Sequence, residues 1–153
     1  MHIEDEVKGL AAARRMFEAD QASAGLGIEL VELAPGRAVA RMKVTGAMLN
    51  GHAIGHGGYI FLLADTTFAL ACNSHGPAAV AAGADISFLR PVSEGDVLTA
   101  RAEERVMLGR SGIYDVSVTR GEPGDAGPDG ASDAHRGEII AEFRGRSRIV
   151  TKR

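Results

Sequence analysis

The periodicity of apolar positions changes along the chain and separates a helical part from a β-rich part. From Glu4 to Asp20 apolar residues recur every three or four positions, which predicts an amphipathic helix. The runs GIELVEL and RAVARMKV follow, and the Pro-Gly pair between them predicts a hairpin. After residue 78, four further runs alternate apolar and polar positions. We therefore expect about six strands, mostly antiparallel.

Between the hairpin and the later strands lies a segment that is apolar on nearly all sides. Glycines precede it, and Asn73 and Gly76 close it, so we predict one buried helix over about 57–74. Such a helix must be wrapped by sheet or by another subunit, because a chain of this size has few other elements to cover it. The pattern predicts an α+β hot-dog fold, a long central helix wrapped by a curved antiparallel sheet.

The length of 153 residues and the 45% apolar content suit one domain over 1–153. No internal repeat or interdomain linker interrupts it. The segment 121–137 is rich in Gly, Pro, Asp and Ser, which is typical of a flexible surface loop. We expect it to be an insertion within the single domain.

The charge pattern narrows the classes of partner. The net charge is −3 with both signs interspersed, so we expect no nucleic-acid partner and no membrane surface partner. The apolar runs are shorter than the roughly 20 residues that cross a bilayer. The charged start lacks the order of a signal peptide, and the single cysteine, Cys72, cannot form an internal disulfide. We expect a cytoplasmic protein with a small-molecule or protein partner.

One carboxylate, Asp65, interrupts the apolar helix. Burying a charge is costly unless something compensates it, so such a position is typical of a functional residue. Asp65 could act as general base on water or attack a carbonyl directly, and partial burial would raise its pKa toward a useful range. The alternative is a structural aspartate that caps a loop or pairs with an arginine across an interface.

Gly57 and Gly58 leave the first backbone N–H groups of the helix open, and those groups have no partner within the helix. Together with the helix dipole they can stabilise an oxyanion, although glycines also serve tight turns and close packing. With Asp65, they suit acyl transfer to water.

The spacing of these groups has a consequence for assembly. Eight residues separate Gly57 from Asp65, which places them roughly 12 Å apart along one helix axis. If two copies of the helix run antiparallel across a two-fold axis, Gly57 of one chain can approach Asp65 of the other. We therefore expect a homo-oligomer in which a dimer forms the site.

The segment MLNGHAIGHGGYIFLLADTTFALACNSHG, followed by DISFLRPVSEGDVLTARA and IYDVSV, resembles the phenylacetyl-CoA thioesterases of the PaaI type, within the hot-dog thioesterase superfamily. The resemblance implies hydrolysis of aryl-acetyl-CoA or related acyl-CoA thioesters, no metal, no cofactor apart from the CoA of the substrate, and a tetramer of two dimers. It implies that Asp65 is base or nucleophile and that the Gly57 N–H polarises the carbonyl. Asn50 would hold water or substrate. Many relatives have cysteine where this chain has Gly55.

The remaining candidates each have a structural alternative. His56 is expected to donate a hydrogen bond that fixes the turn or contacts the thioester oxygen, while His52 and His56 lack a third residue for a metal site. Asn50 precedes Gly51 and could be only a turn residue. Thr66 could contact substrate or bond its own helical turn.

Cationic side chains are needed along the path of the CoA phosphates. Arg90 is one candidate, and Arg110 with Ser111 is another, since related thioesterases hold the nucleotide near the equivalent hairpin. A trio on the last strand is better explained as a solvated face: Arg144, Arg146 and Arg148. Cys72 has no histidine at helical spacing to activate it, so we interpret it as a buried structural thiol.

Two other functions are compatible with a hot-dog fold. An enoyl-CoA hydratase or dehydratase would want a histidine paired with an acid, but no histidine follows Asp65 until His75 at the helix end. A non-catalytic acyl-CoA sensor would use the same pocket, yet the chain supplies neither a helix-turn-helix nor a basic face. We rank both below thioester hydrolysis.

Overall fold

The computed structural model describes residues 3–121 and 137–150, so residues 122–136 of the predicted loop lie outside the described residues. The helices are α1 (Ile3–Glu18), α2 (Gln21–Gly25), the short 3-10 helix η1 (Gly46–Met48) and α3 (Gly57–Asn73). The strands are β1 (Glu29–Ala34), β2 (Arg37–Lys43), β3 (Ala79–Phe88), β4 (Val97–Leu108), β5 (Ser111–Arg120) and β6 (Glu138–Ile149).

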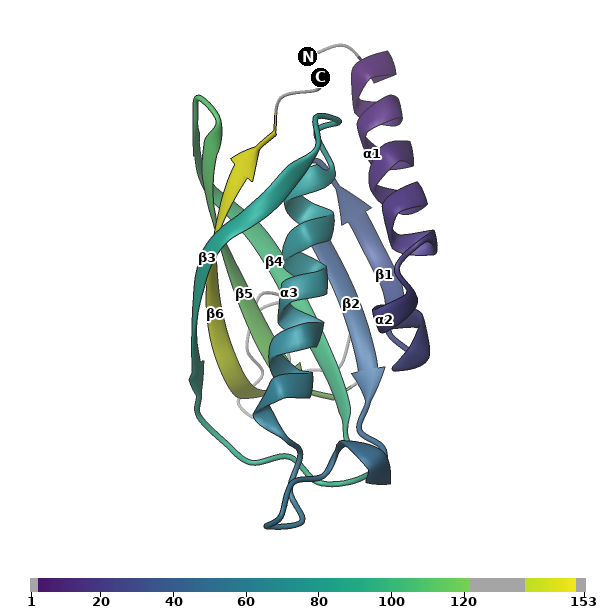
Figure 1. The fold of residues 1–153 in the computed structure, drawn as a ribbon, viewed down its shortest axis with the longest axis vertical. Helices are drawn as coiled ribbons and strands as arrows, with labels where there is room; N and C mark the ends of the chain where they lie inside the picture. Colours follow the sequence, from purple (N-terminus) through teal and green to yellow (C-terminus); the bar gives the residue numbers. More distant parts are fainter. Residues whose placement is uncertain (1–2, 122–136, 151–153) are drawn as a thin grey trace.

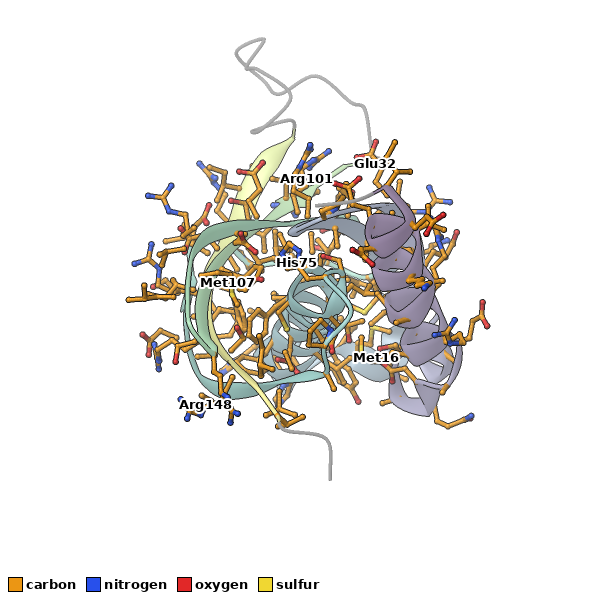
Figure 2. The ribbon with its side chains drawn as sticks, turned by 90° about the horizontal axis from the view of Figure 1, so that it is seen from above. Met16, Glu32, His75, Arg101, Met107 and Arg148 are labelled. Atoms are coloured by element: carbon orange, nitrogen blue, oxygen red, sulfur yellow. The ribbon has the colours of Figure 1, made fainter. Side chains whose placement is uncertain are left out.

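The six strands form one antiparallel sheet in the order β1-β2-β4-β5-β6-β3. The sheet curls around α3, which lies along its concave face (Figure 1). Viewed along α3, the curved sheet surrounds much of the helix, and α1 lies on another side (Figure 2). The predicted arrangement of a central helix wrapped by a curved sheet is therefore confirmed.

The central helix α3 supplies much of the core because nearly every side of it is apolar. Leu63, Ala64 and Leu70 are fully buried, and the ring of Phe68 packs against Tyr114 and Phe143 from the sheet. At Gly145 on β6, a Cβ would lie 2.7 Å from the Phe68 ring, so glycine lets the sheet close over this ring. The bounds of α3 agree with the predicted helix to within one residue.

Helix α1 corresponds to the N-terminal helix predicted over about 4–20, but the short helix α2 that follows it was not predicted. Helix α1 ends at Glu18, and Asp20 caps the short helix α2, with its Oδ1 accepting the Ser23 N–H at 3.0 Å. Helix α1 packs on the C-terminal end of α3, where a Cβ at Gly9 would strike the Ser74 carbonyl oxygen. A glycine in mid-helix is otherwise unfavourable, so close packing explains it.

The strand register defines two ends of the molecule. Phe88 pairs with Ala141, and it lies beside Gly57 at the start of α3. The β4–β5 hairpin pairs through Ser111 with Arg148, at the end where α3 finishes.

None of the described helices is long and apolar enough to cross a membrane.

Candidate active site

The start of α3 forms one part of the candidate site. His56 is its N-cap, and His56 Nδ1 accepts the Gly58 N–H at 2.9 Å, so that N–H is occupied by the cap. The Gly57 N–H has no hydrogen-bond acceptor among the described residues. Phe88 covers this position, since a Cβ at Gly57 would lie 2.9 Å from Phe88 Cζ. Of the two predicted amides, Gly57 is thus the one left open for a developing negative charge.

The His56 ring fixes the turn, but as an acceptor instead of the expected donor. An imidazole that accepts at Nδ1 carries its proton at Nε2 when it is neutral. The ring is exposed and meets Tyr59 edge-on, with ring centroids 6.1 Å apart. Its Nε2–H has no partner among the described residues and is left available as a donor.

Asn50 orders the loop that leads into α3. Its Oδ1 accepts the His52 N–H at 2.8 Å and faces the Ile54 N–H at 3.4 Å, while its own N–H donates to the Ile54 carbonyl. The alternative interpretation as a turn residue is therefore confirmed for Oδ1. The Nδ2 group has no partner within the described part of the chain, so it can donate to water or substrate.

Gly55, where many relatives of the predicted family have cysteine, is explained by its contact with one side chain. A Cβ at this position would strike Val92 Cγ2, and the Gly55 N–H donates to the Val92 carbonyl at 2.8 Å. Val92 is fully buried behind the loop. The side chain of Val92 thus leaves no room for a cysteine at position 55.

Asp65 lies in the middle of α3 on the face that the sheet leaves partly uncovered. The least buried positions around it recur every three or four residues: Gly58, Phe61, Leu62 and Ala69. Burial raises the pKa of the Asp65 carboxyl, and the nearby Asp20 carboxylate raises it further. No hydrogen bond or ion pair to Asp65 is present in residues 3–121 and 137–150, unlike the paired structural aspartate considered as its alternative.

The single chain does not bring Asp65 and Gly57 together. Helix α3 is continuous over its 17 residues, so the spacing of roughly 12 Å along its axis applies. Asn50, His56 and Gly57 lie at the start of the helix, whereas Asp65 lies two turns further on.

The Thr66 hydroxyl lies against α2. Its Oγ1 is 2.8 Å from Ser23 Oγ, and Ser23 Oγ donates to Asp20 Oδ2 at 2.6 Å. Thr66 and Ser23 are both buried. A contact between Thr66 and substrate stays a prediction. No direct signal in the sequence indicates Ser23, although aspartate is a typical N-cap residue, which could have identified Asp20.

Arg90 belongs to an ionic network at the end of α3 where Gly57 lies. Its guanidinium pairs with Glu138 at 3.2 Å and donates to the Ile139 carbonyl at 2.6 Å. Glu138 also binds Arg120, which pairs with Asp96 at 2.7 Å. Arg90 therefore has a structural function beside any contact with substrate.

Arg110 and Ser111 lie exposed on the β4–β5 hairpin, at the other end of the same chain from Gly57. Arg110 and Arg90 are thus far apart within one chain.

On the last strand, Arg144 pairs with Asp115 and Arg146 with Asp85 on an exposed surface, as expected for a solvated face.

Cys72 follows Asp65 by two turns of α3. Burial raises the pKa of its thiol to about 12, so the thiol is protonated at neutral pH. This agrees with the predicted structural thiol.

Over the described residues, no cluster of three His, Cys, Asp or Glu side chains could hold a metal ion.

A cavity of about 380 Å³ lies between α1 and the β1–β2 hairpin, away from these groups. Its lining includes Arg14, Glu32 and Arg37 above an apolar floor. None of the predicted site residues contributes to it.

The fold is that of a hot-dog protein, and comparison with known proteins gives its class, a thioesterase. The sequence pattern of the thioesterase superfamily matches residues 52–126, and the chain belongs to this superfamily. It is 42% identical over 138 residues to acyl-coenzyme A thioesterase PaaI of Escherichia coli (strain K12), covering 90% of this chain and 89% of that protein.

Solved structures give the same result. The structure of the E. coli PaaI protein from the phenylacetic acid degradation operon has a TM-score of 0.81 and 40% sequence identity, with coverage of 95% of this chain and 96% of that one. A mutant of phenylacetic acid degradation protein PaaI from Thermus thermophilus has a TM-score of 0.74 and 33% identity, with coverage of 86% and 100%. The predictions of the hot-dog fold and of a PaaI-type thioesterase family are confirmed.

Proposed function

We propose that the protein hydrolyses CoA thioesters of aryl-acetic acids, of the phenylacetyl-CoA or hydroxyphenylacetyl-CoA type, to the free acid and CoA in aromatic catabolism. The relation to a PaaI thioesterase from a phenylacetic acid degradation operon supports the substrate class. The observation that carries the reaction is Asp65, a half-buried carboxylate with no partner among the described residues. The reaction needs no cofactor apart from the CoA of the substrate, and we expect it to take place in the cytoplasm.

Asp65 promotes attack on the carbonyl carbon of the thioester, and the Gly57 amide stabilises the carbonyl oxygen. Asp65 either takes a proton from the attacking water or attacks the carbonyl carbon itself. The carbonyl oxygen gains negative charge, which the Gly57 N–H stabilises by a hydrogen bond, with the Nε2–H of His56 as a second donor. The carbon–sulfur bond then breaks, and CoA leaves as the thiolate. If an acyl-enzyme anhydride forms, water hydrolyses it in a second step.

A two-fold dimer completes this site. With two α3 helices antiparallel, Asp65 of one chain approaches Gly57 of its partner, and two equivalent sites form. The partly uncovered face of α3 supports this proposal. So do the exposed apolar side chains at the sheet edge, since Val80, Phe88 and Leu89 are each more than half exposed in the single chain. By the resemblance to PaaI-type enzymes, two such dimers form a tetramer.

The antiparallel arrangement also suggests how CoA is held. The β4–β5 hairpin of one chain would lie at the same end as Gly57 of its partner. Arg110 and Ser111 would then contact the nucleotide phosphates from one protomer, and Arg90 would reach them from the other. Asn50 would orient water or the thioester through its Nδ2 group, and Thr66 would contribute to the wall beside Asp65.

A hydrolysis screen over aryl and alkyl acyl-CoA esters tests the proposal. Phenylacetyl-CoA and its hydroxylated analogues should be the best substrates, and Asp65→Asn should lower their turnover by about 10²–10⁴-fold. Wild-type rates in this variant would refute the assignment. Loss of the double bond of an enoyl-CoA would identify a hydratase instead, and tight binding of CoA esters without turnover would identify a sensor.

A further inference from the structure

A chain of hydrogen bonds connects α2 to the residue that follows Asp65. Ser23 is 1% exposed and Thr66 8% exposed, so both hydroxyls are buried. Burying a hydroxyl costs free energy unless it is hydrogen-bonded, and here the two hydroxyls satisfy each other. The contact between α2 and α3 is therefore polar and directional at this point.

The direction of the chain follows from the number of protons. A hydroxyl has a single proton to donate, and Ser23 donates its own to Asp20 Oδ2 at 2.6 Å. Thr66 must then donate to Ser23 Oγ across the 2.8 Å contact. The chain runs from Thr66 through Ser23 and ends on the Asp20 carboxylate.

Helix capping alone does not explain this arrangement. As N-cap of α2, Asp20 needs one oxygen to accept the Ser23 N–H, and Oδ1 does so at 3.0 Å. The second oxygen accepts the Ser23 hydroxyl, and this bond ties the cap to α3. The negative charge of Asp20 is thus held at a fixed place beside the segment that carries Asp65.

The other titratable groups along α3 leave Asp20 as the charged neighbour of Asp65. Cys72 lies on the same helix, but its thiol is neutral. His75 and Glu104 pair with each other at the C-terminal end of α3, and His56 lies at its start. Burial raises the pKa of the Asp65 carboxyl, and the Asp20 carboxylate is the charged group that raises it further.

We propose that Asp20 is a positioning residue for the hydrolysis: held by Ser23 and Thr66, its charge makes Asp65 a stronger base than burial alone would. A carboxylate close to a second carboxylate binds its proton more tightly, and a stronger base accepts a proton from water more readily. The inference rests on the proposed function for its catalytic meaning, but the coupling between the two carboxylates can be measured without turnover.

The test follows the Asp65 carboxyl by ¹³C NMR titration and, in parallel, the acid limb of the pH profile of kcat/KM. Asp20→Asn keeps the cap, because asparagine caps helices as well as aspartate does. It should move both the Asp65 titration and the acid limb to lower pH, because the neighbouring negative charge is removed. Glu18→Gln removes an exposed charge nearby on α1 and should leave both unchanged.

Ser23→Ala supplies the second variant, since it keeps the Asp20 charge but breaks its tie to α3. It should give a smaller shift in the same direction. Titrations that coincide in wild type and Asp20→Asn would overturn the proposal, and a shift in Asp20→Asn without one in Ser23→Ala would overturn the function of the hydrogen-bond chain. If the wild type hydrolyses no CoA ester, the proposed function fails while the titration still decides the coupling.

Discussion

Gly57 and Asp65 lie on one continuous helix, roughly 12 Å apart along its axis, yet in the proposed reaction both must act within about 3–3.5 Å of one carbonyl group. A dimer with antiparallel helices resolves this by pairing Asp65 of one protomer with Gly57 of the other. Two chains with different defects should therefore restore a working site when they are mixed. A single chain with both defects should not.

Two substitutions create the defects. Asp65→Asn removes the base or nucleophile and should lower turnover by about 10²–10⁴-fold. Gly57→Pro removes the amide hydrogen at the first position of α3, where proline is well tolerated. It should lower turnover by about 10²–10³-fold. The proline ring would press on Phe88, whose side chain is half exposed and can turn aside.

The size of the restored activity follows from the symmetry of the dimer. Random pairing of equal amounts gives half mixed dimers, and one of the two sites in each has both groups intact. The mixture should therefore recover about a quarter of the wild-type rate, and mixed dimers isolated through two affinity tags should recover about half. Coexpression followed by a CoA-release assay measures both.

The controls separate this result from simple damage. Gly57→Ala makes the same contact with Phe88 but keeps the amide, so it should retain most of the activity. Each defective variant alone should stay inactive. A mixture no more active than the sum of its parents, with mixed dimers present, would show that both groups act from one chain and would refute the reasoning.

Three further outcomes follow from single contacts. Because folding raises the pKa of Asp65, the wild type loses stability as the pH rises through the folded-state pKa, whereas Asp65→Asn has no such loss. The Tm of Asp65→Asn minus that of the wild type should therefore increase from acidic to neutral pH. A Tm difference independent of pH would contradict this. Gly55→Ala should destabilise the fold by about 1–3 kcal/mol in urea unfolding through its clash with Val92, and adding Val92→Ala should recover part of the loss. Cys72, with a pKa of about 12, should resist a thiol reagent at mildly alkaline pH until the protein is unfolded; rapid labelling of the native state would be inconsistent with its burial.

The fold could be predicted because its signals are local. The apolar segment bounded by Gly57 and Asn73 has the length and end residues of a buried helix, and the alternation after residue 78 is the period of a strand. What was not predicted is the short helix α2 that follows the N-terminal helix. There the N-cap hydrogen bond to Ser23 decides the chain path, and helical periodicity carries no information about it.

Site residues could be predicted only where their immediate sequence neighbours make them unusual. Asp65 stands out because a charge interrupts an apolar helix, and Gly57 because it opens that helix. The bond between Ser23 and Thr66 joins residues 43 positions apart, and Phe88 reaches Gly57 from another strand. Such contacts depend on how the elements pack, so no local pattern indicates them.

The close contact of Gly9 with the end of α3 fixes the position of the N-terminal helices. Helix α1 rests on the last turn of α3 with no room for a methyl group, and α2 continues from α1 to carry the carboxylate that neighbours Asp65. If Asp20 acts on Asp65 as proposed, a larger residue at position 9 would displace α1 and α2 and would change the pH dependence of hydrolysis as well as the stability of the fold. An assay at a single pH would miss that effect.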